Sequence, residues 1–502
     1  MKVNSSVGTE RKHAKAARNR ANAILHLSIN TLSARRSPVE RVLVIDIGGR
    51  SVKILQPGKC KADRCYSLRS GSAPTQTVAI FSYLRERPEI PRARRGRSEP
   101  NLLEGQETLM NQAPSIERIA QESKRGFPFE RVVLVLQGGG ALGAYQAGVY
   151  QALHEAKIDV SWICGTSIGG INGALIAGNR PERRVERLRE FWEAITKPPI
   201  GIPDPALFAA LSWKGIGPAQ LTDRLSALSS MLYGVPDFFT PRLFPPLISA
   251  AVRPDLASCY DTAPLQATLA RLVDFDLINS KSMRFSVAAT NARTGAPVYF
   301  DSLQRPITSA HIVASASLPP NFPPTEIDGE YYWDGAVVSN SPMQYVIDDA
   351  SRYTALVFQV DLWDANGEVP LDVPSAYSRL LEIHSATRLN ITLEQYKKAQ
   401  KFRLAVAKLL EQLPEAARSD PEVQFLAEEA RVRIATLVQL KYQSSRHEPP
   451  SKNFVFSRAA MKEHWQAGHD DAKIALREPR VFELPHITEA ARIFDVHHGW
   501  AT

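Results

Sequence analysis

One serine in this chain stands in a setting suited to nucleophilic catalysis. Residues 165–169 read GTSIG and fall between an apolar run and a helical pattern. Where a chain turns sharply from a buried strand into a helix, the flanking residues must be small, and the serine is held in a strained conformation above the sheet edge. The start of the helix also brings N–H groups and a positive dipole end to that side chain. We therefore predict that Ser167 is a nucleophile; a tight turn with an idle serine is the alternative.

A second motif is the run GGGALG at residues 138–143, directly after an apolar run. Consecutive glycines present unhindered N–H groups to an anion, either a phosphate or the oxyanion of an acyl-transfer intermediate. The spacing also fits the G-x-G-x-x-G fingerprint, which makes a dinucleotide-binding oxidoreductase an alternative. That fingerprint places an acidic residue at the end of the second strand. Here Asp159 precedes that strand, and the GTSIGG turn stands at its end.

A third motif supplies a candidate base. Asp334 follows three aromatic residues and precedes Gly335 and Ala336, a pattern that also occurs in ordinary turns. A nucleophilic serine needs a base, and no histidine of this chain stands in a recognisable strand–loop context. A carboxylate can take the serine proton directly where the site is dry enough to raise its basicity. We therefore predict a Ser167–Asp334 dyad.

The pattern around these motifs predicts an α/β fold with a mainly parallel central sheet. Residues 131–136 and 160–164 form apolar runs typical of buried parallel strands, and helical patterns follow over 144–156 and 168–177. This alternation favours a three-layer α/β/α arrangement, with helices on both faces of the sheet. The other predicted elements are strands within 283–300 and 331–338 and helices over 375–413, near 420–440 and over 457–477.

Composition divides the chain into three regions. Residues 1–128 are basic and rich in Pro, Arg and Ser, and we predict a largely disordered region with one strand–turn–strand piece at 41–55. Residues 129–350 are expected to form a catalytic domain, and 351–502 a mostly helical extension. Within that domain, 198–260 is either an acyl-chain pocket or lid, or the core of an inserted subdomain. Its large apolar residues are Phe208, Leu211, Trp213, Leu232, Tyr233, Phe238, Phe239 and Phe244.

Composition and charge describe a globular protein with a basic excess. The chain has 502 residues and a formal net charge of +9, much of it in the first forty residues. Such an excess attracts phosphates, and we expect contact with an anionic membrane surface or lipid granules and no nucleic-acid partner. No apolar run is long enough to span a membrane, and the first residues lack the long apolar run that a secretory signal would have, although a transit peptide is an alternative. Four scattered cysteines form no disulfide framework or zinc site, so we expect a cytoplasmic protein.

The three motifs together resemble those of the patatin-like phospholipases, over roughly residues 130–350. The stretch SASLPPNFPP at 315–324 also resembles that family's approach to its catalytic aspartate, and residues 456–476 resemble an extension found on a bacterial branch. The resemblance implies Ser167 as nucleophile and Asp334 as proton acceptor. It implies an oxyanion hole formed by Gly138, Gly139 and Gly140. Its supporting motif positions are Gly143, Gly165, Gly169, Gly335 and Ala336.

The implied activity is that of a serine phospholipase or esterase, which cleaves lipid carboxylic esters through an acyl-enzyme in lipid catabolism or remodelling. No metal or organic cofactor is implied. The chain departs from the family at Ala141 and Leu142, where many members carry Arg or Lys after the glycines. A catalytically silent scaffold on a membrane or granule surface is a further alternative. The fragment Asp46 to Arg50 resembles the phosphate loop of actin-like sugar kinases, but too little of such a domain is present for activity.

Overall fold

A computed structural model describes two compact units of the chain, residues 1–109 and 110–502. The described residues are 42–46, 52–55, 77–80, 128–197, 218–242, 253–349, 354–386, 389–431, 434–443, 448–449, 451–486, 489 and 491–500. No helix among them is both long enough and apolar enough to cross a membrane.

The first unit contains a small antiparallel sheet in the order β2–β1–β3, formed by β1 (Val42–Asp46), β2 (Val52–Leu55) and β3 (Thr77–Ile80). The pairing of β1 with β2 agrees with the strand–turn–strand pattern predicted over 41–55. Strand β3 was missed, because it lies in a segment whose composition indicated a linker. The disorder predicted for the rest of 1–128, and the Gly48–Gly49 turn, lie outside the described residues.

The second unit is built on one large sheet in the order β10–β11–β8–β5–β4–β12–β13–β14–β15, with β9 also paired to β8. Its six inner strands, from β8 to β14, are parallel, and β9, β10, β11 and β15 are antiparallel. The strands are β4 (Arg131–Leu136), β5 (Trp162–Thr166), β8 (Arg284–Asn291), β9 (Pro297–Asp301), β10 (Thr325–Ile327), β11 (Glu330–Asp334), β12 (Ala355–Asp361), β13 (Ala435–Lys441), β14 (Ala491–Asp495) and β15 (Gly499–Trp500). A separate pair joins β6 (Thr240–Pro241) and β7 (Tyr260–Asp261).

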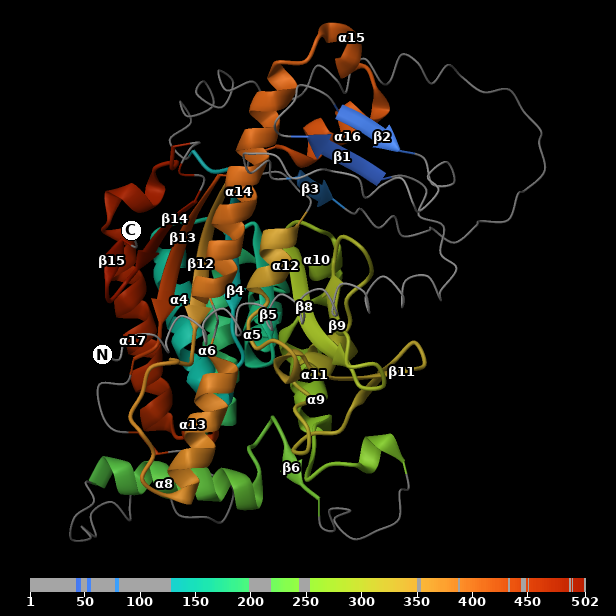
Figure 1. Ribbon diagram of the computed structural model, residues 1–502. Helices are drawn as coiled ribbons and strands as arrows, with labels where there is room; N and C mark the ends of the chain where they lie inside the picture. The colour runs from blue at the N-terminus through green and yellow to red at the C-terminus, as the bar shows by residue number, and fades with distance from the viewer. Residues whose placement is uncertain are drawn as a thin grey trace, which may run out of the picture. The chain divides into compact units, whose positions relative to one another are not determined.

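Helices cover both faces of this sheet, which gives the predicted three-layer α/β/α fold (Figure 1). The helices are α4 (Ala144–Glu155), α5 (Ile168–Ala177), α6 (Arg184–Ile195), α8 (Pro218–Tyr233), α9 (Ala263–Leu272), α10 (Phe275–Asn279), α11 (Ser309–Ser315), α12 (Met343–Asp348), α13 (Val373–Ser385), α14 (Leu389–Glu411), α15 (Glu415–Arg418), α16 (Pro421–Glu429) and α17 (Arg458–Leu476). Successive side chains of a strand point to opposite faces. Accordingly Leu134 and Leu136 of β4 join the core under α4, α5 and α17, whereas Val133 and Val135 pack toward α12 and Tyr396 of α14.

Several predicted elements need correction. The strand predicted at 160–164 occupies 162–166, and the helix predicted over 375–413 is two helices, α13 and α14. The helix predicted near 420–440 ends at Glu429, and β13 follows it. A short apolar run that is buried on both faces cannot be distinguished from a buried helix by its periodicity alone. For the same reason the segment 351–502, expected to be mostly helical, also contributes β12 to β15 to the central sheet.

The C-terminal helix α17 packs directly on α4, the helix that follows the glycine motif. Gly148 of α4 faces α17 so closely that a Cβ there would lie 1.8 Å from the Trp465 carbonyl oxygen. Gly468 of α17 faces α4 in the same way, and its Cβ would lie 2.0 Å from the Tyr145 carbonyl oxygen. The two backbones are therefore in contact, and both positions require glycine.

We predict that Gly468→Ala lowers the free energy of unfolding by roughly 2–4 kcal/mol, because the methyl group would force the two helix backbones apart. In an exposed helix the same change would stabilise the protein by about 1 kcal/mol, so the sign of the effect is diagnostic. Urea unfolding of the purified protein measures it. Lys462→Ala, at an exposed position of the same helix, is the matched control and should change the value by less than about 0.5 kcal/mol. A neutral or stabilising Gly468→Ala would contradict the close contact.

Candidate active site

Ser167 forms the turn between β5 and α5 and has a left-handed backbone conformation, with φ 57° and ψ −125°. A residue other than glycine is rarely found there, and such strain is kept only where the surroundings enforce it. Part of that enforcement comes from Ser315 at the end of α11, since its buried Oγ accepts a hydrogen bond of 2.9 Å from the Ser167 N–H.

The glycines on either side of Ser167 are required by contact with backbone atoms. A Cβ on Gly165 would lie 2.4 Å from the Gly169 carbonyl oxygen, and a Cβ on Gly169 would lie 2.3 Å from that of Leu136. Gly143 is enclosed by side chains instead, because its Cβ would lie 2.5 Å from Ile168 Cγ1. These three glycines let α5 start directly at the end of β5 and against the glycine motif.

The register of the sheet brings Asp334 to the turn that carries Ser167. Strand β5 runs parallel to β8 and ends with Thr166 opposite Ala288. Strand β11 runs antiparallel to β8 and ends with Asp334 opposite Ala289. Because β9 occupies the other edge of β8, β5 and β11 share one edge and arrive there from opposite directions. Ser167 and Asp334 therefore lie together, although 167 positions separate them in the sequence.

Asp334 is fully buried at this junction, and burial raises the pKa of its carboxyl group to about 7. The Ser167 hydroxyl and the Ala336 N–H both act to lower that pKa, less strongly. The Ala336 N–H donates a hydrogen bond of 2.8 Å to Oδ1. Oδ2 has no hydrogen-bond partner among the described residues. Gly335 fits tightly here, because its Cβ would lie 2.8 Å from Ala288 Cβ.

The glycine motif lies beside Ser167, since a Cβ on Gly138 would be 3.1 Å from Ser167 Cβ. Gly138 is fixed through its own peptide groups. Its N–H donates to the Asn340 carbonyl oxygen at 3.2 Å, and its carbonyl oxygen accepts from Asn340 Nδ2 at 3.0 Å and from Trp363 Nε1 at 2.8 Å. Within the described chain, the N–H groups of Gly139 and Gly140 have no such acceptor. Two of the three predicted oxyanion donors are thus available, and the third is engaged.

Segments far along the chain hold this loop in place. Gly140, at φ 58°, packs so closely on Asn453 that its Cβ would lie 2.5 Å from the Asn453 carbonyl oxygen, and Gly139 packs on Leu362. Just before the glycines, the Gln137 side chain accepts hydrogen bonds from the Leu362 and Trp363 N–H groups at 2.5 and 3.2 Å.

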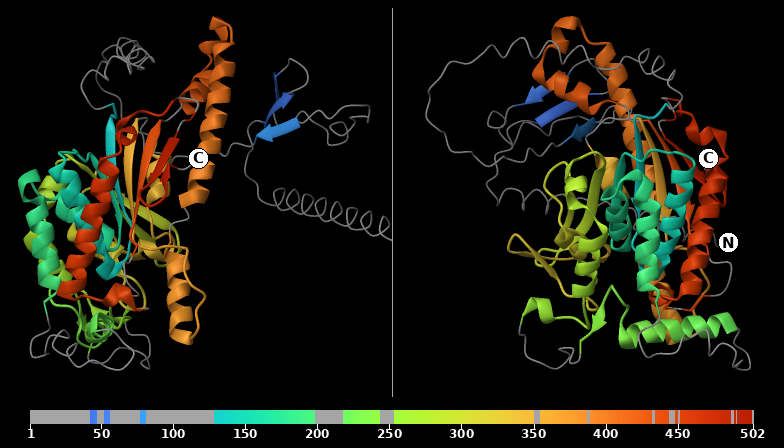
Figure 2. Two further views of the ribbon diagram at one scale, coloured as in Figure 1. Left: turned by 90° about the vertical axis from the view of Figure 1, so that its left-hand side faces the viewer. Right: turned by 180° about the vertical axis from the view of Figure 1, so that it is seen from behind.

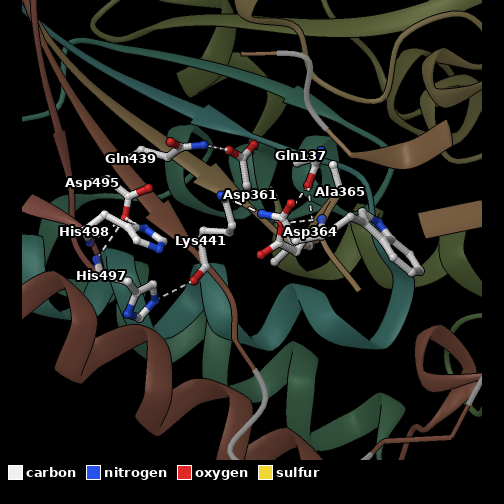
Figure 3. Close-up of polar contacts among 12 residues, drawn as sticks. Gln137, Asp361, Asp364, Ala365, Gln439, Lys441, Asp495, His497 and His498 are labelled. Carbon is white, nitrogen blue, oxygen red and sulfur yellow. Dashed lines mark hydrogen bonds and ion pairs between the residues drawn. The ribbon is translucent and has the colours of Figure 1, made fainter. Parts of the chain in front are cut away.

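Polar contacts continue from Gln137 across the ends of the neighbouring strands (Figure 3). Gln439 Nε2 of β13 donates a hydrogen bond of 2.8 Å to Asp361 Oδ2 of β12, and Lys441 Nζ lies 4.0 Å from Asp364 Oδ1. His497, which follows β14, has its Nε2 2.9 Å from the carbonyl oxygen of Lys441 in β13, and His498 Nδ1 lies 3.1 Å from Asp495 Oδ1 of β14. The sheet end that carries the glycine loop is therefore cross-linked as far as β14.

Ser167, Asp334 and the three glycines open into one pocket with a volume of about 120 Å³. Its walls are mostly apolar, and the aromatic residues that line it are Phe238, Phe239, Phe322, Trp363, Phe454 and Phe456. None of the described residues that line it is a histidine. No group of three or more His, Cys, Asp or Glu side chains in the described residues is placed to hold a metal ion.

The segment 198–260 contributes to this pocket only in part. Phe238 and Phe239 line it, whereas Leu232 and Tyr233 are exposed on α8. The remaining candidates, Phe208, Leu211, Trp213 and Phe244, lie outside the described residues.

Sequence reasoning missed four contributors to the site. They are Ser315, Asn340, Trp363 and Asn453. Ser315 and Asn340 belong to polar stretches close to the motifs, SASLPP and DGAVVSN, and that proximity was the available signal. Trp363 and Asn453 carried none, because only the fold of 354–456 brings them to the glycine loop.

The buried carboxyl group predicts a pH-dependent effect of Asp334→Asn on stability. With a folded pKa of about 7 and an ordinary unfolded value near 4, ionisation is costly only in the folded protein. Below pH 4 both states are protonated and the cost vanishes; above pH 7 it is fully present. Asp334→Asn should therefore stabilise the protein by about 2–4 kcal/mol at pH 8 and by little at pH 4. Urea unfolding at both values tests this, with Asp328→Asn, an exposed position, as control. Equal effects at both pH values would contradict it.

Two family models match the chain. The patatin-like phospholipase model matches residues 134–347, and a patatin phospholipase model matches residues 383–487. Together they cover more than half of the chain, including all three motifs and helix α17.

Curated relatives are similar to short stretches of this chain, and a solved structure aligns with more of it at low sequence identity. Patatin-like phospholipase domain-containing protein 6 of Homo sapiens is 46% identical over 66 residues, which is 13% of this chain and 5% of that protein. A lysophospholipase of Aspergillus terreus is 37% identical over 103 residues, 18% of this chain and 7% of that protein. VipD from Legionella pneumophila has a crystal structure that aligns with 69% of this chain and 66% of its own, at 14% identity and a TM-score of 0.30.

The aligned regions thus span a tenth or less of these curated relatives' own lengths. The family matches nevertheless extend over both the glycine–serine–aspartate site and the C-terminal segment that packs on it. The chain belongs to the patatin-like phospholipase family.

Proposed function

We propose that this protein is a serine lipid acyl hydrolase, a phospholipase or esterase that cleaves carboxylic esters of lipids with a Ser167–Asp334 dyad. The observation that carries the proposal is the meeting of a strained serine and a buried aspartate of raised pKa at the base of one apolar pocket. The relatives' names, which include a lysophospholipase, support the substrate class. The lipid would be met at a membrane or granule surface.

In the first half of the reaction, Ser167 Oγ attacks the ester carbonyl carbon, and its proton passes to Asp334 Oδ2. That oxygen is suited to the role because it has no hydrogen-bond partner among the described residues. The negative charge that forms on the carbonyl oxygen is stabilised by the N–H groups of Gly139 and Gly140. A donor of this kind contributes about 3–4 kcal/mol in comparable sites.

Collapse of this intermediate breaks the ester bond. Asp334 returns the proton to the leaving alcohol, and the acyl group remains on Ser167. A water molecule then attacks the acyl-enzyme, and Asp334 accepts its proton. Asp334 passes that proton to Ser167 Oγ as the acyl–oxygen bond breaks, so the fatty acid leaves and both residues are regenerated. The dry surroundings of Asp334 support this dual use, because a pKa near 7 lets one carboxyl group act as base and as acid at neutral pH.

A dinucleotide-binding oxidoreductase, which the glycine spacing left open, fits less well. The end of β5, where the ribose-binding acid would stand, carries Ser167, and the Gly138 N–H is already bonded to Asn340. A silent scaffold is also disfavoured, because a nucleophile turn without catalysis would retain the strain at Ser167 without use.

We expect Ser167→Ala to reduce the release of fatty acid from phospholipid vesicles and from p-nitrophenyl esters by about a thousandfold or more, since the attacking oxygen is lost. A fluorophosphonate probe should label the parent protein and not this variant. Ser282→Ala, at an exposed position, should retain full activity and labelling. An unchanged rate in Ser167→Ala would refute the proposal.

The pKa of Asp334 also sets the pH dependence. Only the ionised carboxylate can accept the serine proton, so kcat/KM should fall about tenfold per unit below pH 7 and level off above it. Initial rates with a neutral, water-soluble ester between pH 5 and 9 measure the profile. A profile that levels off above pH 5 would mean that a different group acts as the base.

A further inference from the structure

Helix α8 packs on the protein through polar and small residues and exposes leucines, the reverse of an ordinary surface helix. Its leucines Leu221, Leu225, Leu228 and Leu232 recur every three or four residues and so form one stripe. Leu228 is 51% exposed and Leu232 is 57% exposed. The other side of the helix is buried, yet it carries polar or small residues, Asp223, Ser226, Ala227 and Ser230. Leu221 and Leu225 are half-buried, and packing among the described residues does not explain why Leu228 and Leu232 point outward.

Helix α13 has a second outward apolar stripe. Val373, Tyr377 and Leu380 recur with helical spacing and are 82%, 65% and 61% exposed. The approach to this helix adds Leu371, which is 97% exposed. Residue Leu381, next to Leu380, turns instead into the pocket above Ser167. One helix thus joins the exposed apolar surface to the wall of the candidate active site.

The two helices lie near each other at one end of the second unit. This is the end at which the parallel strands end, as Figure 1 and the two further views of Figure 2 show. Arg224 of α8 is close enough to Asp372, the N-cap of α13, to help lower the pKa of that carboxyl group. Helix α8 also borders the pocket from its other side, because Ala227 packs in one cluster with Val455 and Phe454, and Phe454 lines the pocket.

We propose that the exposed faces of α8 and α13, here called the docking face, bind the surface of a phospholipid bilayer and hold the pocket against it. The proposal rests on the proposed function, because a lipid ester must leave the bilayer to reach Ser167. A protein partner or a second copy of the chain on the docking face would lie over the rim of the pocket, whereas a bilayer in that place supplies its substrate.

The charges of the docking face fit this occupant. Glu382 of α13 is neutralised by Arg379 at 3.0 Å and by Lys452 at 3.1 Å, and Asp223 is buried. Arg224 is exposed beside the leucine stripe and lies near the exposed Asp372, so these two charges offset each other. Helices that lie in a membrane interface combine an apolar face with flanking basic residues that meet anionic head groups.

The test measures co-sedimentation with vesicles of phosphatidylcholine and phosphatidylglycerol. Every protein carries Ser167→Ala, so that the lipid is not consumed. We expect the pair Leu228→Glu with Leu232→Glu, and separately Tyr377→Glu with Leu380→Glu, to weaken binding roughly tenfold or more, because each removes apolar area and adds like charge. Leu409→Glu on α14, 63% exposed and far from the docking face, is the matched control and should bind like the parent. Unchanged binding by both pairs would overturn the proposal.

A second readout separates this proposal from the proposed function. With Ser167 intact, each docking-face pair should hydrolyse a water-soluble short-chain ester within about twofold of the parent and vesicle phospholipid roughly tenfold more slowly. If neither the parent protein nor the docking-face pairs hydrolysed any ester, but the pairs lost vesicle binding, the proposed function would be wrong. The role of the docking face would then still hold. If the pairs changed a dimer into a monomer and still bound vesicles, the face would be an interface between copies, and the proposal would be wrong.

Discussion

The geometry of this site depends on two strands that meet on one edge of β8. Strand β5 delivers Ser167 from one direction and β11 delivers Asp334 from the other, at neighbouring residues of the same partner strand. Backbone hydrogen bonds to β8 therefore set the distance between Ser167 and Asp334, and no flexible loop intervenes. The surroundings then determine the chemistry. Glycines remove the side chains that would block the turn, and complete burial raises the basicity of the carboxylate.

The C-terminal segment is part of this arrangement. Strand β12 lies beside β4 in the middle of the sheet, and Trp363, which follows it, holds the Gly138 carbonyl group. Asn453 closes on Gly140, and α17 packs on α4 through paired glycines. The family match to residues 383–487 includes Asn453 and α17, which pack on the glycine loop and on α4.

The sequence alone predicted the local structure correctly where a residue type has one physical role. Glycines around Ser167 predicted a sharp strand-to-helix turn, and the continuous apolar run of 131–136 predicted an inner parallel strand, as found. It was insufficient where long-range pairing decides. β13 has the same apolar character as a buried helix, and only its place beside β12 makes it a strand. The engagement of the Gly138 N–H depends on Asn340, which no spacing rule connects to the glycine loop.

The position of β12 in the sequence has a consequence for folding during synthesis. Glu130 and Thr354, which flank the paired starts of β4 and β12, are 224 residues apart. At ordinary translation speeds, roughly 10–50 s pass between the synthesis of β4 and that of β12, the strand that pairs with it. Until then β4 offers an unpaired, strongly apolar strand edge, a template for aggregation. The nascent chain should therefore depend on chaperones, and a fragment that ends before β12 should be insoluble however complete its motifs are.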